Sequence, residues 1–451
     1  MRDAIVLAVT GVLALAALRT PLTGILAFSA MSILGPHSLT WGVARTFPHS
    51  QVIALATILG FLVSSEPKRL PREREVGLVF ALWVLFAIST AFALRPEFAI
   101  DRLIFVSKIF LMMLLATMIV NTPEKLHALV RVVAISLGLL AAKIGIFVFA
   151  TALQQKAYGP EETYLFDENA LGIALAANVP LLVYLFRVEQ ARWLRRALVA
   201  MICLSYPAVV ATFSRGAWLS LGAVSVLLVT NSRRKILTFV LVLVLAIGVS
   251  IWQDRIVSDR LAARWDTLVN YQEDTSAESR LWNWEFCRRV GMARPVGGGF
   301  DFQSPEAYLH YYPEFALRWP GKVWVCHNTW LQFLAEHGVL GFLLGVGLLV
   351  SCILSVRRLT REAGRQGTRS SIGELAPMVG VSFVAFLTGG TFLDVAYHEL
   401  LYQLIAIVII AKSLWRQGPD SSIGRDKAAS ASTAAAVLHE WRPRRDTPPR
   451  E

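Results

Sequence analysis

The stretch Gly338–Val356, GVLGFLLGVGLLVSCILSV, decides the fold class, because it is long enough to cross a bilayer and carries no charged side chain. Comparable apolar blocks recur along the 451 residues, at Gly77–Ala93, Leu103–Val120, Gly172–Phe186, Ile236–Trp252 and Leu404–Leu414. A soluble protein of this length would instead show polar faces at helical or strand spacing. The apolar blocks therefore indicate a protein that crosses a membrane many times.

Composition supports the same interpretation, with 55% hydrophobic residues and a mean hydropathy of +0.53. We predict an all-α polytopic membrane protein, with about 12 transmembrane helices and one long periplasmic loop. The expected spans are residues 4–18, 22–35, 50–65, 77–94, 100–120, 127–152, 169–186, 197–213, 216–230, 235–252, 328–355, 374–393 and 397–416. The first two are short, and they count either as one broken element or as two spans.

The orientation in the membrane is indicated by Lys and Arg in short loops, which favour the cytoplasmic side. Basic residues gather at Lys68–Arg74, Arg187–Arg196, Arg233–Lys235 and Arg357–Arg369, and again in the tail after Leu414. These clusters alternate correctly with the expected spans, so we place them and the C-terminus in the cytoplasm. The net charge of +12 is scattered over many loops, which argues against nucleic acid as a partner.

Four regions follow from this topology. Residues 1–252 form an N-terminal transmembrane bundle, 253–327 a long periplasmic loop with short helices, and 328–416 the C-terminal transmembrane helices. The tail 417–451 is rich in Ala, Ser, Pro and Arg and is expected to be disordered in the cytoplasm. No cleavable signal peptide is evident, so the apolar residues after Arg2 are interpreted as the first membrane segment.

The long loop is rich in aromatic residues, and its acidic and basic charges nearly cancel. Aromatic side chains favour the membrane interface and also stack on sugars. Cys287 and Cys326 both lie in this loop. A disulfide between them requires a compartment outside the cytoplasm, and their spacing alone does not favour the bond.

Arg215 occupies the turn Ser214-Arg215-Gly216, between two apolar blocks at ends expected to lie outside the cytoplasm. An arginine there runs against the usual charge bias, so it needs a reason. It either snorkels to a lipid headgroup or binds an anion, because a guanidinium pairs with phosphate through two hydrogen bonds.

The segment Glu278–Arg289, ESRLWNWEFCRR, is predicted to be helical, with Arg280, Trp284 and Arg288 on one face. These arginines are a second candidate anion site. The alternative is an amphipathic interface helix with solvated arginines. The glycine-rich stretch Arg294–Phe300 follows, and a plain turn is favoured there over a contact with a ligand.

His327 and Asn328 are expected at the outer mouth of a span that runs inward. A helix N-terminus lowers the pKa of a nearby histidine, and a neutral imidazole can accept a proton from a hydroxyl. A polar helix cap is the alternative. His337 lies about 15 Å further along the axis, so it is either a lining residue or a less certain alternative base.

The sequence shows no H-E-x-x-H metal motif, phosphate-binding Walker loop, G-x-S-x-G elbow or D-x-D motif. We therefore expect no metal and no cofactor.

These motifs, in this order and topology, resemble the O-antigen ligase and polymerase superfamily, and O-antigen ligases in particular. The resemblance covers about residues 50–415. It rests on Ser214-Arg215-Gly216, Ser279-Arg280 with nearby tryptophans, the turn Pro295–Phe300, and His327-Asn328 with Gly338 and Gly341.

The resemblance implies a membrane-embedded GT-C-like glycosyltransferase in the bacterial inner membrane, with its active site at the periplasmic face. The implied donor is a glycan on undecaprenyl diphosphate, and the implied acceptor is a sugar hydroxyl of lipid A–core. The implied reaction is metal-independent and inverting. Arg215, Arg280 and Arg288 would bind the diphosphate, His327 would act as the base, and Asn328 would support it.

Two alternatives remain open from the sequence. A polymerase of O-antigen, or a transferase that glycosylates protein, would share the same motifs and differ in the acceptor. A transporter of polysaccharide or lipid-linked sugar belongs to a different class, and predicts charged residues deep in many spans. Most expected spans here are free of such residues.

Overall fold

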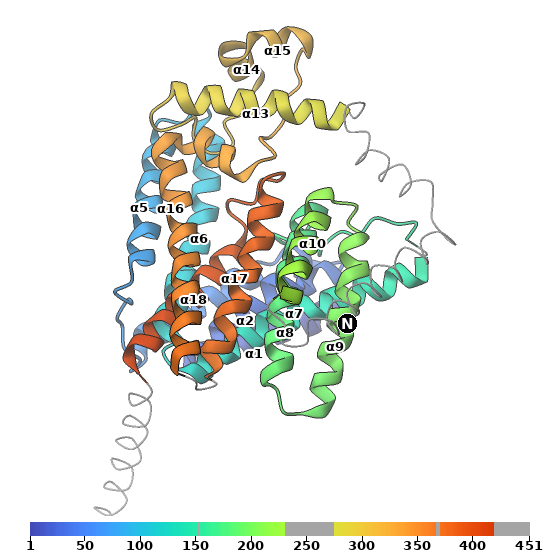
Figure 1. Ribbon diagram of the computed structural model, residues 1–451, viewed down its shortest axis with the longest axis vertical. Coiled ribbons are helices and arrows are strands. Elements are labelled where there is room, and N and C mark those ends of the chain that lie inside the picture. The colour runs from blue at the N-terminus through green and yellow to red at the C-terminus, as the bar shows by residue number, and fades with distance from the viewer. Residues whose placement is uncertain (152, 231–274, 367–369, 419–451) are drawn as a thin grey trace, which may run out of the picture.

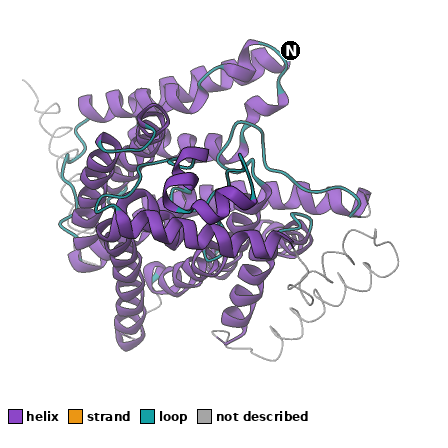
Figure 2. Cartoon of the chain, turned by 90° about the horizontal axis from the view of Figure 1, so that it is seen from above, coloured by secondary structure: helices purple, strands orange, loops and turns teal. Residues whose placement is uncertain are grey.

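The computed structural model describes residues 1–151, 153–230, 275–366 and 370–418, and no strand occurs among them (Figure 2). The expected span at 235–252, the first part of the long loop and the tail beyond residue 418 lie outside the described residues. Within the described part, the predicted all-helical class is confirmed.

Seven described helices are long and apolar enough to cross a membrane. They are α5 (Arg74–Ala91), α6 (Pro96–Ile119), α7 (Pro123–Thr151), α8 (Glu168–Val188), α9 (Arg192–Val210), α16 (Thr329–Gln366) and α17 (Ser371–Gly390). Shorter apolar helices are α2 (Pro21–Leu34), α4 (His49–Val63) and α10 (Arg215–Thr230). A multi-pass membrane protein is confirmed at this level, and the count of about 12 spans stays a prediction.

The remaining elements complete the bundle and cover one of its ends. They are α1 (Arg2–Arg19), η1 (Pro36–Leu39), α3 (Val43–Thr46), α13 (Thr275–Ala293), α14 (Pro305–Tyr311), α15 (Pro313–Arg318) and α18 (Glu399–Gln417). Proline at the first position starts several helices, where its missing N–H costs nothing.

Helix α8 stands at the centre of one half of the bundle, in contact with α7, α9, α10 and α17. Of the 18 residues in its most apolar stretch, 78% are buried, against 39% in the corresponding stretch of the peripheral α9. The buried Asn178 on α8 donates its amide N–H to the carbonyl oxygen of Ala134 on α7, at 3.0 Å. This satisfies an N–H donor of the side-chain amide, which would be costly to leave unpaired in apolar surroundings.

Helix α13 lies across one end of the bundle, with α14 and α15 beyond it (Figure 1). We call this the α13 end, and the opposite end the far end. A separate apolar cluster, which includes Phe286, Tyr308 and Phe315, holds α13 to α14 and α15. A disulfide joins Cys287 on α13 to Cys326, the residue before His327, although the spacing of the two cysteines does not favour it.

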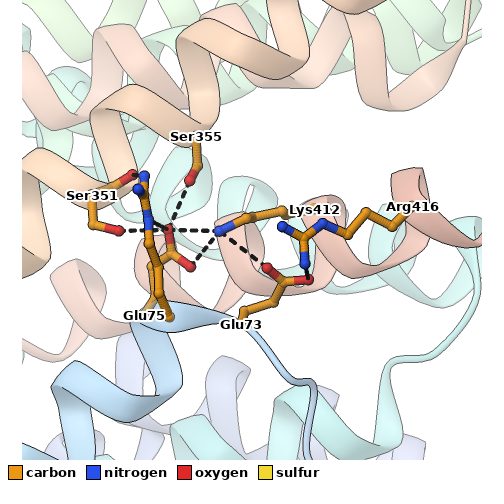
Figure 3. Close-up of polar contacts among 7 residues, drawn as sticks. Glu73, Glu75, Ser351, Ser355, Lys412 and Arg416 are labelled. Atoms are coloured by element: carbon orange, nitrogen blue, oxygen red, sulfur yellow. Dashed lines mark hydrogen bonds and ion pairs between the residues drawn. The ribbon is translucent and has the colours of Figure 1, made fainter.

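At the far end, a buried ion cluster joins α5, α16 and α18 (Figure 3). The Glu75 carboxylate is fully buried and accepts hydrogen bonds from Ser351 and Ser355, both at 2.7 Å. Lys412 on α18 donates to both oxygens of Glu75, at 2.7 and 3.0 Å, and pairs with Glu73 at 3.0 Å. A buried charge persists only when its partners replace its hydration, so this cluster fixes the register of three helices.

The substitution Lys412→Met is expected to destabilise the protein by about 3–5 kcal/mol, because it leaves Glu75 as an uncompensated buried charge. Unfolding of the full chain in one detergent measures the effect. The double variant Lys412→Met/Glu75→Gln should recover most of the loss. Arg416→Gln, at a half-exposed partner of Glu73, should cost less than about 1 kcal/mol. A Lys412→Met protein as stable as the parent would show that the cluster does not stabilise the bundle.

Candidate functional site

The long helix α16 is broken at Gly338, whose φ of 69° and ψ of −172° are not helical. The break separates residues 329–337 from 339–366, although the sequence predicts one continuous span. A positive φ is easily adopted only by glycine. Because of this break, the first segment is a short piece at the α13 end, and its direction differs from that of a continuous helix.

The glycine-rich turn after α13 fills the gap at this break. The amides of Gly298 and Gly299 donate to the carbonyl oxygens of Ala335 and Glu336, at 2.7 and 2.9 Å. These carbonyls lose their partners in the helix because the chain leaves the helical path at Gly338. The turn therefore caps a broken helix, which agrees with the plain turn favoured from the sequence.

His327 and Asn328 stand at the head of α16 and are held by Asp394. The Asp394 carboxylate accepts the backbone N–H of His327 at 2.9 Å and that of Asn328 at 3.1 Å. His327 has a positive φ of 50°, a conformation that is uncommon for residues other than glycine. Its side chain is half-buried. The two hydrogen bonds from backbone N–H groups to Asp394 fix the backbone that carries this imidazole.

Asn328 is the N-cap of α16. Its Oδ1 accepts the backbone N–H groups of Trp330 and Leu331, both at 3.0 Å, as a capping side chain does. Its Nδ2 donates to the carbonyl oxygen of Thr391 at 2.9 Å. Asn328 therefore joins the start of α16 to the loop between α17 and α18, and the helix-cap alternative is confirmed for this residue.

Arg215 begins α10, and this helix start lies beside the same loop. A Cβ at Gly216 would contact the Leu393 side chain at 3.3 Å. Further along α10, Ser220 Oγ donates to the carbonyl oxygen of Ala385 on α17, at 2.8 Å. The two helices run in opposite directions, so the start of α10 and the end of α17 meet. The structure thus brings Arg215 to the loop that carries Asp394.

Helix α13 passes over the same region. The ring of Trp284 lies 6.5 Å from that of Phe392 in the loop. Arg280, one turn earlier on α13, is close enough to His327 for its positive charge to lower the pKa of the imidazole. The face of α13 that carries Arg280 and Trp284 therefore lies over His327 and Phe392.

Arg288 is placed differently. It forms a two-bond ion pair with Glu285 on the same helix, with both distances 2.8 Å, and its side chain is 55% exposed. Arg289 also donates to Glu285 at 2.8 Å. The hydrogen bonds from Arg288 and then Arg289 lower the pKa of Glu285 to about 2. In this structure Arg288 is a surface group, and Arg280 is the arginine of α13 near His327.

The electrostatic setting of His327 comes from burial and from three charged neighbours. Burial lowers the pKa of His327, because the surroundings disfavour the charged imidazolium, and Arg280 lowers it further. Asp394, and more weakly Asp167 at the start of α8, oppose this shift. Burial also raises the pKa of Asp394. The result is an imidazole that favours the neutral form.

The starts of α8, α10 and α16 converge on this site. Asp167 caps α8 by accepting the amides of Asn169 and Ala170, both at 3.0 Å, and a Cβ at Gly172 would contact Ala217 and Thr212 near the start of α10. The N-terminal ends of helices carry partial positive charge. Together with Arg215 and Arg280, they make this site suited to an anion.

His337 belongs to a different environment. Its side chain is fully buried, with Nδ1 at 2.7 Å from Ser89 Oγ and Nε2 at 2.7 Å from Tyr397 Oη. Tyr397 donates in turn to Glu336 at 2.5 Å, and the ring lies 4.1 Å from that of Phe86. Both ring nitrogens are engaged, which favours a structural role over that of an alternative base.

Asp394 and Tyr397 are the important residues that the sequence analysis did not identify. Both lie in the short segment Asp394–Glu399 between two apolar helices, whose polar members are Asp394, Tyr397, His398 and Glu399. That run of polar groups is a signal for this junction, but nothing in it indicates contact with residues 327 and 328. Among the described residues, no group of three His, Cys, Asp or Glu side chains is arranged to hold a metal ion.

Comparison with known families gives two matches. Residues 198–346 match the family described as O-Antigen ligase, and residues 1–190 match a family of unknown function, DUF5935. No curated protein matches the chain. The resemblance predicted from the motifs is confirmed over residues 198–346, which carry Arg215, Arg280 and His327. Asp394 lies beyond the matched residues.

The substitution Gly338→Ala is expected to lower the free energy of unfolding by about 2 kcal/mol or more, because the side chain is strained at positive φ. A Cβ there would also lie 2.1 Å from the carbonyl oxygen of Pro295. Unfolding of the full chain in detergent measures the loss. Gly347→Ala is the matched control in the same helix, since a Cβ at Gly347 meets nothing within 4 Å; it should be neutral or stabilise slightly. Equal effects of the two substitutions would contradict this account of the break.

Proposed function

We propose that this protein is a lipopolysaccharide O-antigen ligase. It transfers a glycan from undecaprenyl diphosphate to a sugar hydroxyl of lipid A–core, by a metal-independent inverting reaction. The proposal is carried by one observation: a half-buried His327 lies beside Asp394 and Arg280, at the place where α10 begins with Arg215. The match of residues 198–346 to O-antigen ligases supports it.

His327 is the base in this proposal. An unprotonated ring nitrogen accepts the proton of the acceptor hydroxyl as the oxygen attacks the anomeric carbon of the donor. Burial favours the neutral imidazole, so the base is ready at ordinary pH. Asp394 positions the residue through the backbone amide of His327, and its charge stabilises the imidazolium that forms.

Arg215 and Arg280 bind the diphosphate that leaves. Negative charge grows on the phosphate oxygens as the glycosidic bond breaks, and fixed positive groups at that point lower the barrier. The helix starts beside Arg215 add to this field. The acceptor oxygen attacks on the face opposite the diphosphate, so one displacement inverts the anomeric carbon. Arg288 would first have to leave Glu285, and is therefore assigned a smaller role.

The α13 end is proposed to face the periplasm of a bacterial inner membrane. The Cys287–Cys326 disulfide supports this side, because such bonds persist outside the cytoplasm. The far end, with basic residues near the ends of α8, α16 and α18, then faces the cytoplasm together with the C-terminus.

The deciding experiment is transfer in vitro by the purified full chain, with EDTA present. The donor is an undecaprenyl-diphosphate glycan and the acceptor is purified lipid A–core. Glycan-modified lipid A–core supports the ligase. Longer undecaprenyl-linked glycan would indicate a polymerase, and glycosylation of an added pilin-like protein would indicate a protein O-oligosaccharyltransferase. No transfer to any acceptor would contradict the whole enzyme proposal and favour transport.

In that assay His327→Ala should lower the rate constant by about 10²- to 10⁴-fold, because the general base is lost. Arg215→Ala and Arg280→Ala should each lower it by about 10²- to 10³-fold. The matched controls are Arg288→Gln, with a loss of no more than about fivefold, and His310→Ala at an exposed histidine. An Arg288→Gln loss as large as that of Arg280→Ala would reverse their assigned roles. Full activity of His327→Ala would refute the assigned base.

The pH dependence gives a separate test of the base. Because burial holds the pKa of His327 below its ordinary value of 6.5, transfer should stay constant near neutral pH and fall only as pH drops through that lower pKa. Asp394→Asn removes a charge that favours the imidazolium, so it should move this acid limb to still lower pH. The rate constant of single-turnover transfer measures the midpoint. An acid limb above pH 6.5, or one that moves upward in Asp394→Asn, would contradict this assignment.

A further inference from the structure

A basic groove lies at the far end of the bundle, where α8 ends and α9 begins. It has a volume of about 430 Å³ and lies open to the surface. Its lining residues are Phe186, Arg192, Arg195, Arg196 and Val199. The groove is separate from the candidate site, since α8 begins at the α13 end and reaches the groove only with its last turn.

The arginines of the groove differ from other basic residues nearby. Arg187 pairs with Glu374 at 3.7 Å, and Arg131 pairs with Glu189. Within the part of the chain that the structure describes, none of the three groove arginines forms an ion pair. Three like charges on one helical turn repel each other, and an anion between them relieves that repulsion.

One wall of the groove is apolar. The guanidinium of Arg195 lies 4.7 Å from the centroid of the Phe186 ring, a cation–π contact that orients it. Val199 lies one turn further along α9, and its side chain is exposed. The groove therefore combines charged donors at one end with an apolar surface that continues along the helix.

The position of the groove matches the depth of lipid headgroups. Helices α8 and α9 are both long and apolar enough to cross the membrane, and the groove lies at their shared end. Trp193 lies on the same turn as the arginines and is 72% exposed. Exposed tryptophan is typical of the membrane interface. A ligand in this groove thus meets the headgroup layer at its charged end and acyl chains at its apolar end.

We infer that this groove binds the phosphate headgroup of an anionic phospholipid. The phosphate oxygens accept hydrogen bonds from the arginines, which offer two parallel N–H groups each, and an acyl chain lies along the exposed side of α9 past Val199. Charge complementarity commits the site to an anionic lipid, because a zwitterionic headgroup brings a cation into the arginine cluster. The inference does not depend on the proposed function.

A charge signal for membrane topology is the competing explanation of the same arginines. A topology signal requires positive charge near the helix ends, but no particular arrangement of the side chains. Lysine satisfies it as well as arginine does, whereas a bidentate phosphate site prefers arginine. Substitution of arginine by lysine therefore separates the two explanations.

The test is lipid binding to the purified full chain in detergent. The probes are phosphatidylglycerol, phosphatidylcholine with the same acyl chains, and soluble glycerol phosphate. Native mass spectrometry counts retained lipid, and titration gives the apparent Kd. The site variants replace Arg192, Arg195 and Arg196 together, either by Gln or by Lys. The matched control replaces three exposed arginines at the far end of α16 by Gln, namely Arg357, Arg361 and Arg365.

Phosphatidylglycerol should bind more tightly than phosphatidylcholine, and the Gln variant should lose on the order of 100-fold in affinity, at about fivefold for each arginine. The Lys variant should lose about tenfold, and the α16 control no more than about twofold. Equal losses in the site variant and the control, or full binding by the Lys variant, would show that charge alone acts. If glycerol phosphate binds as tightly as phosphatidylglycerol, the ligand of the groove is a free phosphate ester and not a lipid. If the Gln variant does not fold, the Lys variant decides.

Discussion

Two backbone amides that share one carboxylate organise the α13 end of this protein. Asp394 accepts the N–H groups of His327 and of the N-cap residue Asn328, which stand just before the first turn of α16 and have no partner inside that helix. In apolar surroundings every such group needs a partner. The bond fixes the start of α16 to the loop after α17, and the same loop receives the start of α10 and the Trp284 ring. The candidate site exists because this loop satisfies those amides.

The need for hydrogen-bond partners also explains how the break of α16 at Gly338 is closed. The carbonyl oxygens freed at Gly338 are satisfied by the amides of Gly298 and Gly299, so the turn after α13 closes over the break. The first segment of α16 is consequently held at both ends by parts of the chain outside it. His327, the proposed base, directly precedes this segment, so its backbone is anchored by Asp394 on one side and joins a fixed segment on the other.

The sequence predicts the helical class well, because uninterrupted apolar blocks such as Gly338–Val356 have few other physical solutions. It also predicts Arg215 and His327 as candidates, because they lie at the expected outer ends of spans. Arg280 is predicted because it lies on one face of an expected helix in the long loop. Asp394 was not predicted, because it lies 67 residues after His327, with the whole of α17 in between. The surroundings of Arg288 and His337 differ in this respect. Glu285 stands three residues before Arg288, a spacing that allows an ion pair on the predicted helix, although the sequence does not show that Arg288 uses it. The closed cluster of His337 with Ser89 and Tyr397 joins distant parts of the chain and is set by packing, so helical spacing gives no sign of it.

The central position of α8 has a consequence for how the sequence can drift during evolution. A helix in contact with four others turns little of its surface to lipid, so most positions along it are bounded by neighbouring side chains or by Asn178 and its partner. Peripheral α9 has a broad face where one aliphatic residue can replace another without repacking. Related sequences should therefore vary more along the outer side of α9, apart from the groove arginines, while α8 changes slowly. Changes in α8 should be accompanied by compensating changes in α7, α10 or α17.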